Sequence, residues 1–152
     1  MGFSLLGTII AVIILLPSII FFIKFPPGND AEQTSRLPKI FQMLEKIGQI
    51  GCILSLIISK DFFLAETANY FTLLMIVCIA LYYALWIVAA MKGGDLSVLL
   101  KPLVFIPIPG AVLPVCAFAF AALWGNCLWL GASALLLAVG HCAISWESYK
   151  RQ

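Results

Sequence analysis

Apolar residues along this chain form long continuous runs, separated by short clusters of charges, glycines and prolines. About 20 apolar residues cross the roughly 30 Å of hydrocarbon in a bilayer as a helix, whereas barrel strands alternate apolar and polar residues over about ten positions. The runs therefore predict five membrane spans, at residues 4–23, 38–58, 68–91, 103–124 and 127–146. The predicted fold is an all-α polytopic membrane protein, a five-transmembrane-helix bundle in which residues 1–152 form a single membrane domain.

The division of the last apolar stretch into two spans depends on one turn. Residues 103–146 would measure about 66 Å as a single helix, roughly twice the thickness of the hydrocarbon. The turn signal inside this stretch is Gly125-Asn126, flanked by Trp124 and Trp129. Indole rings favour the interface between headgroups and hydrocarbon. We therefore predict a tight hairpin at Gly125-Asn126.

Four prolines lie inside the predicted spans, Pro17 in the first and Pro107, Pro109 and Pro114 in the fourth. Each lacks a backbone N–H and leaves a carbonyl without its helical donor. The fourth span is therefore predicted to be kinked or partly unwound near its beginning. Such breaks border substrate sites in transporters, and they also occur as plain kinks where neighbouring helices satisfy the freed groups.

The distribution of charge orients the spans. With five crossings, eight of the nine basic residues fall on one side of the membrane and only Lys60 falls on the other. Basic residues accumulate on the cytoplasmic side, so we predict a multi-pass plasma-membrane protein with its amino terminus outside and its carboxyl terminus in the cytoplasm. The first run is expected to persist as a span, because it lacks the basic start and the small-residue cleavage site of a secretory signal.

Composition excludes several other classes of protein. Hydrophobic residues make up 63% of the 152 residues and charged residues 11%, with a mean hydropathy of +1.10. These values exclude a water-soluble globule and a disordered chain. The five cysteines form no C-x-x-C pair, the single histidine does not suffice for a zinc site, and no basic cluster suits nucleic acid. We therefore predict no metal, no cofactor and no nucleic-acid partner.

Glu45 is the acidic residue that lies well inside a predicted span. It shares a helical face with Gln42 and Gln49, at spacings of three and four residues. In one interpretation this face is an interfacial turn, from which Lys39, Glu45 and Lys46 extend to the headgroups. In the other, Glu45 lines a pocket that opens to the cytoplasm.

His141 is the partner that the sequence offers to Glu45. It lies five residues before Trp146 in the fifth span, which is antiparallel to the second, so the two side chains are expected at comparable depth and within reach of a hydrogen bond. Ser145 lies one helical turn away on the same face. The alternative interpretation is that His141 has only a structural role, in which it hydrogen-bonds to a neighbouring helix and binds no ligand.

The candidate ligand site lies in the cytoplasmic half of the bundle. Its six predicted residues are Glu45, Gln49, His141, Ser145, Tyr82 and Pro109. Tyr82, with Tyr83 and Trp86, is expected to line the same space, although aromatic packing also explains these residues.

Three classes of function fit these predictions. The leading one is a non-enzymatic membrane protein that binds or passes a small molecule, or serves as a membrane subunit of a complex. The second is a structural or regulatory partner, which packs small-residue faces against another membrane protein or a second copy of itself. The third is a membrane enzyme that uses Glu45 and His141 as acid and base.

Several segments resemble a group of small five-span bacterial membrane proteins. The resembling segments are L-E-x-I-G-x-x-G at residues 44–51, H-x-x-I-S at 141–145, Leu16-Pro17, and Tyr83 with Trp86. The resemblance implies a bacterial cell membrane and five spans. The group brings no activity, cofactor or catalytic residue to these positions.

Overall fold

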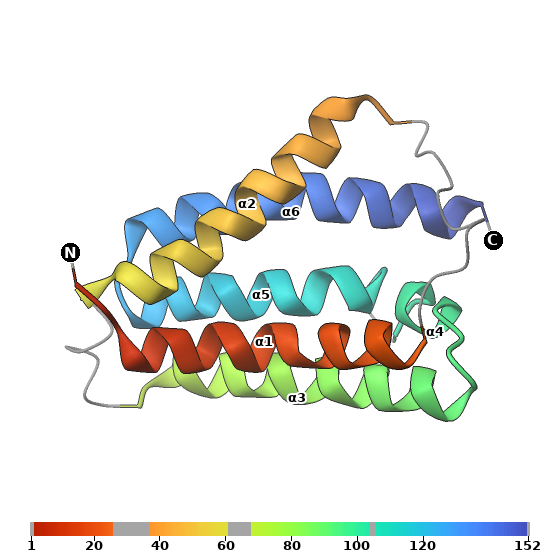
Figure 1. The fold of residues 1–152 in the computed structure, drawn as a ribbon, viewed down its shortest axis with the longest axis horizontal. Coiled ribbons are helices and arrows are strands. Elements are labelled where there is room, and N and C mark those ends of the chain that lie inside the picture. The colour runs from red at the N-terminus through yellow and green to blue at the C-terminus, as the bar shows by residue number, and fades with distance from the viewer. Residues whose placement is uncertain (1, 26–36, 61–67, 104–105, 152) are drawn as a thin grey trace.

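A computed structural model describes residues 2–25, 37–60, 68–103 and 106–151. Within these ranges the protein is all-helical, as predicted, and no β-strand is present. Five long helices and one short one follow each other along the chain (Figure 1). They are α1 (Leu5–Lys24), α2 (Lys39–Ile58), α3 (Tyr70–Met91), α4 (Ser97–Leu100), α5 (Pro109–Trp124) and α6 (Leu128–Lys150).

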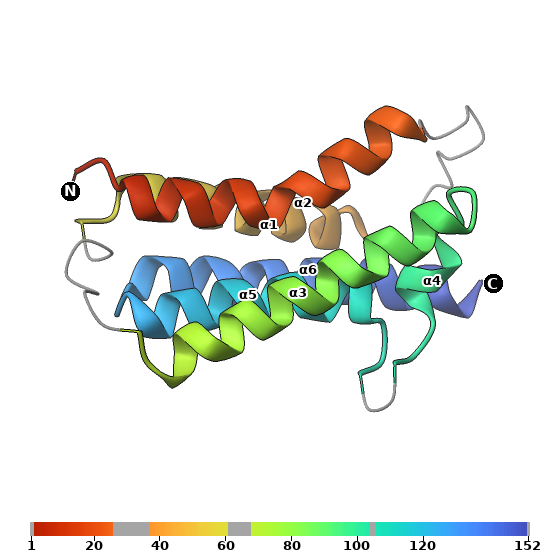
Figure 2. The ribbon, with the colours of Figure 1, turned by 90° about the horizontal axis from the view of Figure 1, so that it is seen from below.

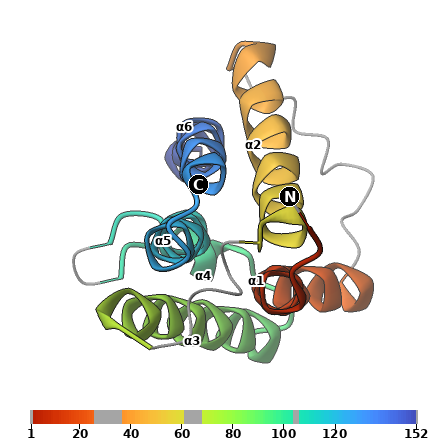
Figure 3. The same ribbon diagram turned by 90° about the vertical axis from the view of Figure 1, so that its left-hand side faces the viewer.

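The long helices form an antiparallel bundle in which α1, α3 and α6 run one way and α2 and α5 run the other (Figure 1). Helix α2 packs most extensively on α6, and α5 lies between α3 and α6. Helix α1 contacts both α2 and α3 and closes that side of the bundle (Figure 3). The two described ends of the chain consequently lie at opposite ends of the bundle (Figure 1).

The described basic residues gather at one end of the bundle, which we call the basic end. Here α1, α3 and α6 finish and α2 and α5 begin (Figure 1). The basic residues at the ends of these helices, or next to them, are Lys24, Lys39, Lys92, Lys101, Lys150 and Arg151. Lys60 follows the last residues of α2 at the opposite end.

Four of the described helices, α1, α2, α3 and α6, are long and apolar enough to cross a membrane. The fifth long helix, α5, has only 16 residues, or about 24 Å of helix. The helix within the predicted fourth span starts at Pro109 and not at Leu103, in agreement with the unwinding predicted near the beginning of this span. Pro107 and Pro109 lack the amides that would continue a helix backwards, and Ile108 takes the left-handed conformation with φ of 64°.

Other predicted boundaries agree closely with the structure. The hairpin between α5 and α6 falls at Gly125-Asn126, where Asn126 has φ of 48° and so reverses the chain. Helix α6 continues past Trp146 to Lys150, four residues beyond the predicted span. The polar residues after Trp146 thus add a further helical turn at the basic end.

Pro17 interrupts the hydrogen bonding of α1, which bends in its second half (Figure 2). Since Pro17 has no N–H, the carbonyl of Ile13 loses its helical donor. The hydroxyl of Tyr83 on α3 donates to this carbonyl at 2.7 Å. A neighbouring helix thus satisfies the group that the proline frees, as membrane helices require.

Two glycines let α2 and α6 approach until their backbones touch. A Cβ added to Gly48 would overlap the backbone of Leu137, and one added to Gly140 would overlap the backbone of Glu45 and Phe41. Small residues at such crossings allow close van der Waals packing between helices in membranes. Because Gly140 lies against Glu45, this crossing also places residue 45 beside the next residue of α6, His141.

Candidate functional site

A cavity of about 540 Å³ lies inside the bundle, in the half next to the basic end. Each of the five long helices and α4 contributes to its wall. The cavity extends along the first turn of α5, where Gly110, Ala111 and Pro114 line it. The volume is within the range of about 300–1,000 Å³ that is usual for small-molecule sites.

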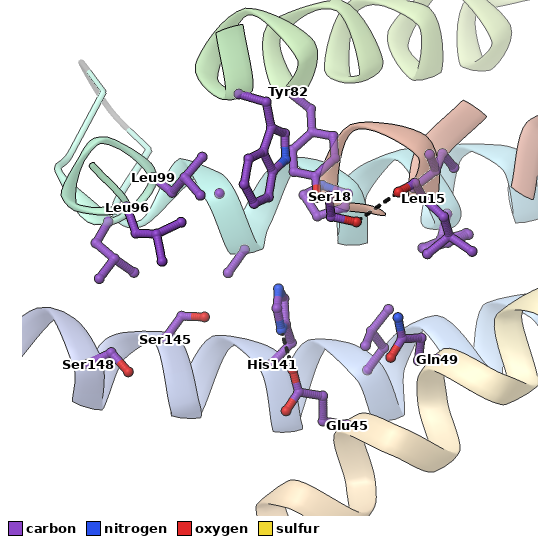
Figure 4. Close-up of a pocket in the computed structure, with 18 of the residues that line it drawn as sticks. Leu15, Ser18, Glu45, Gln49, Tyr82, Leu96, Leu99, His141, Ser145 and Ser148 are labelled. Atoms are coloured by element: carbon purple, nitrogen blue, oxygen red, sulfur yellow. Dashed lines mark hydrogen bonds and ion pairs between the residues drawn. The ribbon is translucent and has the colours of Figure 1, made fainter. Parts of the chain in front are cut away.

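Glu45 and His141 meet on one wall of the cavity (Figure 4). The Nδ1 atom of His141 lies 2.5 Å from Oε1 of Glu45. A carboxylate accepts hydrogen bonds and does not donate them, so the imidazole donates from Nδ1. About a third of each side chain is exposed, 27% for Glu45 and 31% for His141, so the pair is open to a molecule in the cavity.

Gln49 and Ser145 extend this polar wall along both helices. Gln49 lies one turn beyond Glu45 on α2, and Ser145 lies one turn beyond His141 on α6 (Figure 4). Ser148 also lines the cavity, close to the end of α6. The wall made by α2 and α6 therefore offers a carboxylate, an imidazole, an amide and two hydroxyls.

The opposite wall is largely aromatic. Tyr82 and Trp86 of α3 and Phe22 of α1 line it, with Ser18 next to Tyr82 (Figure 4). The Trp86 ring centroid lies 6.0 Å from that of Tyr82 and 6.0 Å from that of Phe22. The indole Nε1 of Trp86 is buried, and no described residue accepts a hydrogen bond of good geometry from it.

The short helix α4 closes the cavity at the basic end with Leu96, Leu99 and Leu100. Asp95 lies two residues before this helix, and its carboxylate accepts hydrogen bonds from the backbone N–H of Ser97 at 2.9 Å and from the Ser97 hydroxyl at 2.8 Å. These two bonds hold the pKa of the Asp95 carboxyl below its usual value. The two bonds therefore favour the carboxylate form, which accepts them both.

Five of the six residues predicted for the site line the cavity. They are Glu45, Gln49, Tyr82, His141 and Ser145. Pro109, the first residue of α5, is fully buried and does not line the cavity, and the next residue, Gly110, lines it instead. Tyr83 also lies elsewhere, since its hydroxyl is turned to the backbone of α1.

The contribution of α1 and α4 to the cavity could not be predicted from the sequence. Ser18 and Phe22 lie in a continuously apolar helix, where no polar stripe marks the inward face. The proximity of Ser18 to Pro17 was the one available signal, because breaks in membrane helices often adjoin ligand sites. No comparable signal marked the leucines of α4.

The cysteines lie outside this cavity. All five are free, and Cys127 is buried at the opposite end of the bundle, where the hydroxyl of Ser59 lies 3.4 Å from its sulfur. Among the residues that the structure describes, no three histidine, cysteine or acidic side chains come together as metal ligands do. The polar chemistry of the cavity therefore belongs to the Glu45–His141 pair and to neutral side chains.

Comparison with known proteins gives no further guide to this chemistry. No protein-family model, no curated protein and no solved structure matches the chain. Any assignment of function therefore rests on the geometry of the cavity and on the residues that line it.

Proposed function

We propose that this protein is a membrane protein that binds a small molecule in the cavity next to its basic end. The observation that carries the proposal is the convergence of six helices on one cavity, with the Glu45–His141 pair on one wall and Tyr82 and Trp86 on the other. Ionisable side chains inside membrane bundles are costly, and most of them serve a function. Binding is favoured over catalysis, because the carboxylate and the imidazole already satisfy each other.

The proposed setting is a bacterial plasma membrane, crossed five times, with the basic end in the cytoplasm. Gathering of the basic residues at one end supports this orientation. Helix α5 is short, but half of its residues are buried among the other helices. Ile106 and Ile108, which precede it, pack against the rest of the protein, and irregular backbone that is buried in protein is tolerated within a membrane. A reporter that works only in the cytoplasm should be active when fused to the carboxyl terminus; a folded but inactive fusion would reverse the orientation.

Quenching of Trp86 fluorescence tests whether the cavity binds small molecules. We would retain Trp86 as the only tryptophan, change the other three to Phe, and titrate the protein in lipid nanodiscs with neutral 4-bromobenzyl alcohol. Bromine quenches indole fluorescence at short range, so a probe in the cavity is expected to quench Trp86 in a saturable manner.

Two variants of α6 locate the bound probe. Ser145→Phe places an aromatic side chain in the cavity and is expected to weaken saturable quenching at least tenfold. Ala132→Phe places the same side chain on an exposed position of the same helix and should leave binding unchanged. Quenching that never saturates and is equal in all three proteins would mean that the probe only dissolves in the lipid, and would contradict the proposal.

A further inference from the structure

The charged residues that line the cavity favour ligands of one charge over another. The lining contains one carboxylate, Glu45, and no lysine or arginine among the described residues. The partner of Glu45 is an imidazole, which can donate this hydrogen bond without carrying a charge. With a neutral His141, the cavity carries one net negative charge, and a cationic ligand would compensate it.

The aromatic wall provides a second, independent feature that favours a cation. The Trp86 ring is nearly perpendicular to both of its neighbours in the lining, at 88° to Tyr82 and 73° to Phe22. The three rings that line this wall therefore lie in different planes around the cavity. The electron-rich faces of such clusters attract ammonium groups, and aromatic cages of this kind recognise quaternary ammonium ligands.

The backbone of α5 adds a third feature. Pro114 lacks the amide that would pair with the carbonyl of Gly110, and both residues line the cavity. A carbonyl without its helical donor carries a partial negative charge, which also suits a cation. The remaining wall is apolar, with Ile14, Phe118 and Leu137 available to the hydrophobic part of a ligand.

We propose that the ligand of this cavity is an organic cation, a protonated amine or quaternary ammonium with an apolar body, held between the Glu45 carboxylate and the rings of Tyr82, Trp86 and Phe22. This inference rests on the proposed binding function and adds the chemical class of the ligand. An anion is disfavoured, because it would meet the Glu45 carboxylate and no lysine or arginine in the described lining. A neutral ligand would gain no electrostatic attraction from Glu45.

A pair of isosteric probes tests this inference. 4-Bromobenzyl-trimethylammonium and 1-bromo-4-neopentylbenzene have the same shape and differ in charge, because carbon replaces the quaternary nitrogen. Saturable quenching of Trp86 would be measured for both in nanodiscs of zwitterionic lipid, at equal probe-to-lipid ratios in the bilayer. The cation is expected to bind at least tenfold more tightly than its neutral isostere.

Variants of two acidic residues then identify the carboxylate that is responsible. Glu45→Gln is expected to remove the tenfold preference for the cation, whereas Glu147→Gln, on α6 outside the cavity lining, should preserve it. Should Glu45→Gln fail to fold, the ratio of the two affinities in the protein with Glu45 intact still decides the matter. Equal or tighter binding of the neutral isostere would overturn the inference and leave the proposed binding function standing. Absence of saturable quenching by either probe would overturn both.

Discussion

Gly140→Ala is expected to destabilise the protein by about 2 kcal/mol, although alanine is the better helix former. The new Cβ would overlap the backbone of Glu45 and Phe41, and backbone atoms cannot rotate away as a side chain can. Overpacking of this kind costs about 1–3 kcal/mol or more, against a gain of about 1 kcal/mol in helix propensity. Unfolding in mixed micelles of increasing dodecyl sulfate content would measure the change.

Gly131→Ala is the matched control, because it makes the same change in the same helix. Its Cβ would lie 3.8 Å from the Cβ of Ala122, which is an ordinary contact. This variant is expected to be as stable as the unmodified protein or up to about 1 kcal/mol more stable. If both alanine variants unfolded at the same detergent composition, the close crossing of α2 and α6 would be wrong.

His141→Ala is expected to weaken binding of the cationic probe about tenfold or more while reducing stability by only about 1 kcal/mol. The imidazole holds one oxygen of Glu45, and a hydrogen bond to a charged group contributes about 1.5–3 kcal/mol. Hydrogen bonds between membrane helices contribute less to folding, about 0.6 kcal/mol on average. Titration with the probe and unfolding of the same protein sample would measure the two effects separately.

The conservative variant and a neighbouring residue complete this experiment. His141→Asn keeps an N–H donor and is expected to restore part of the affinity. Cys142→Ala, next to it on α6 and outside the cavity lining, should change neither quantity appreciably. If His141→Ala lost as much stability as binding affinity, His141 would instead have a structural role, as a hydrogen-bonding contact between α2 and α6.

The sequence was sufficient to predict the wall of the cavity that contains Glu45 and His141. Both residues are polar interruptions in apolar runs, and the turn at Gly125-Asn126 fixes the direction of α6 relative to α2. When the ends of two antiparallel helices are known, the depth of each residue in the membrane follows from its position along the helix, because each residue adds about 1.5 Å. Depth and direction together therefore predict that Glu45 and His141 lie within reach of each other.

Beyond Tyr82 and Trp86, the opposite wall could not be predicted, for a physical reason. Helices α1, α3 and α5 are apolar on every side, so no stripe tells which face turns inward and which meets lipid. The face that α1 turns towards α3 includes the Ile13 carbonyl, which accepts a hydrogen bond from Tyr83, a residue 70 positions away in the sequence. For the same reason the sequence predicted a role for Pro109 but could not place its neighbour Gly110 in the lining.

Location of a bound cation would test the account most directly. Crystals of the protein containing 4-bromobenzyl-trimethylammonium, measured at the bromine absorption edge, would give an anomalous peak at the bromine atom. The account predicts this peak inside the cavity, with the ammonium density between the carboxylate of Glu45 and the rings of Tyr82 and Trp86. A peak found only on the lipid-facing surface, with the cavity empty of probe, would contradict it.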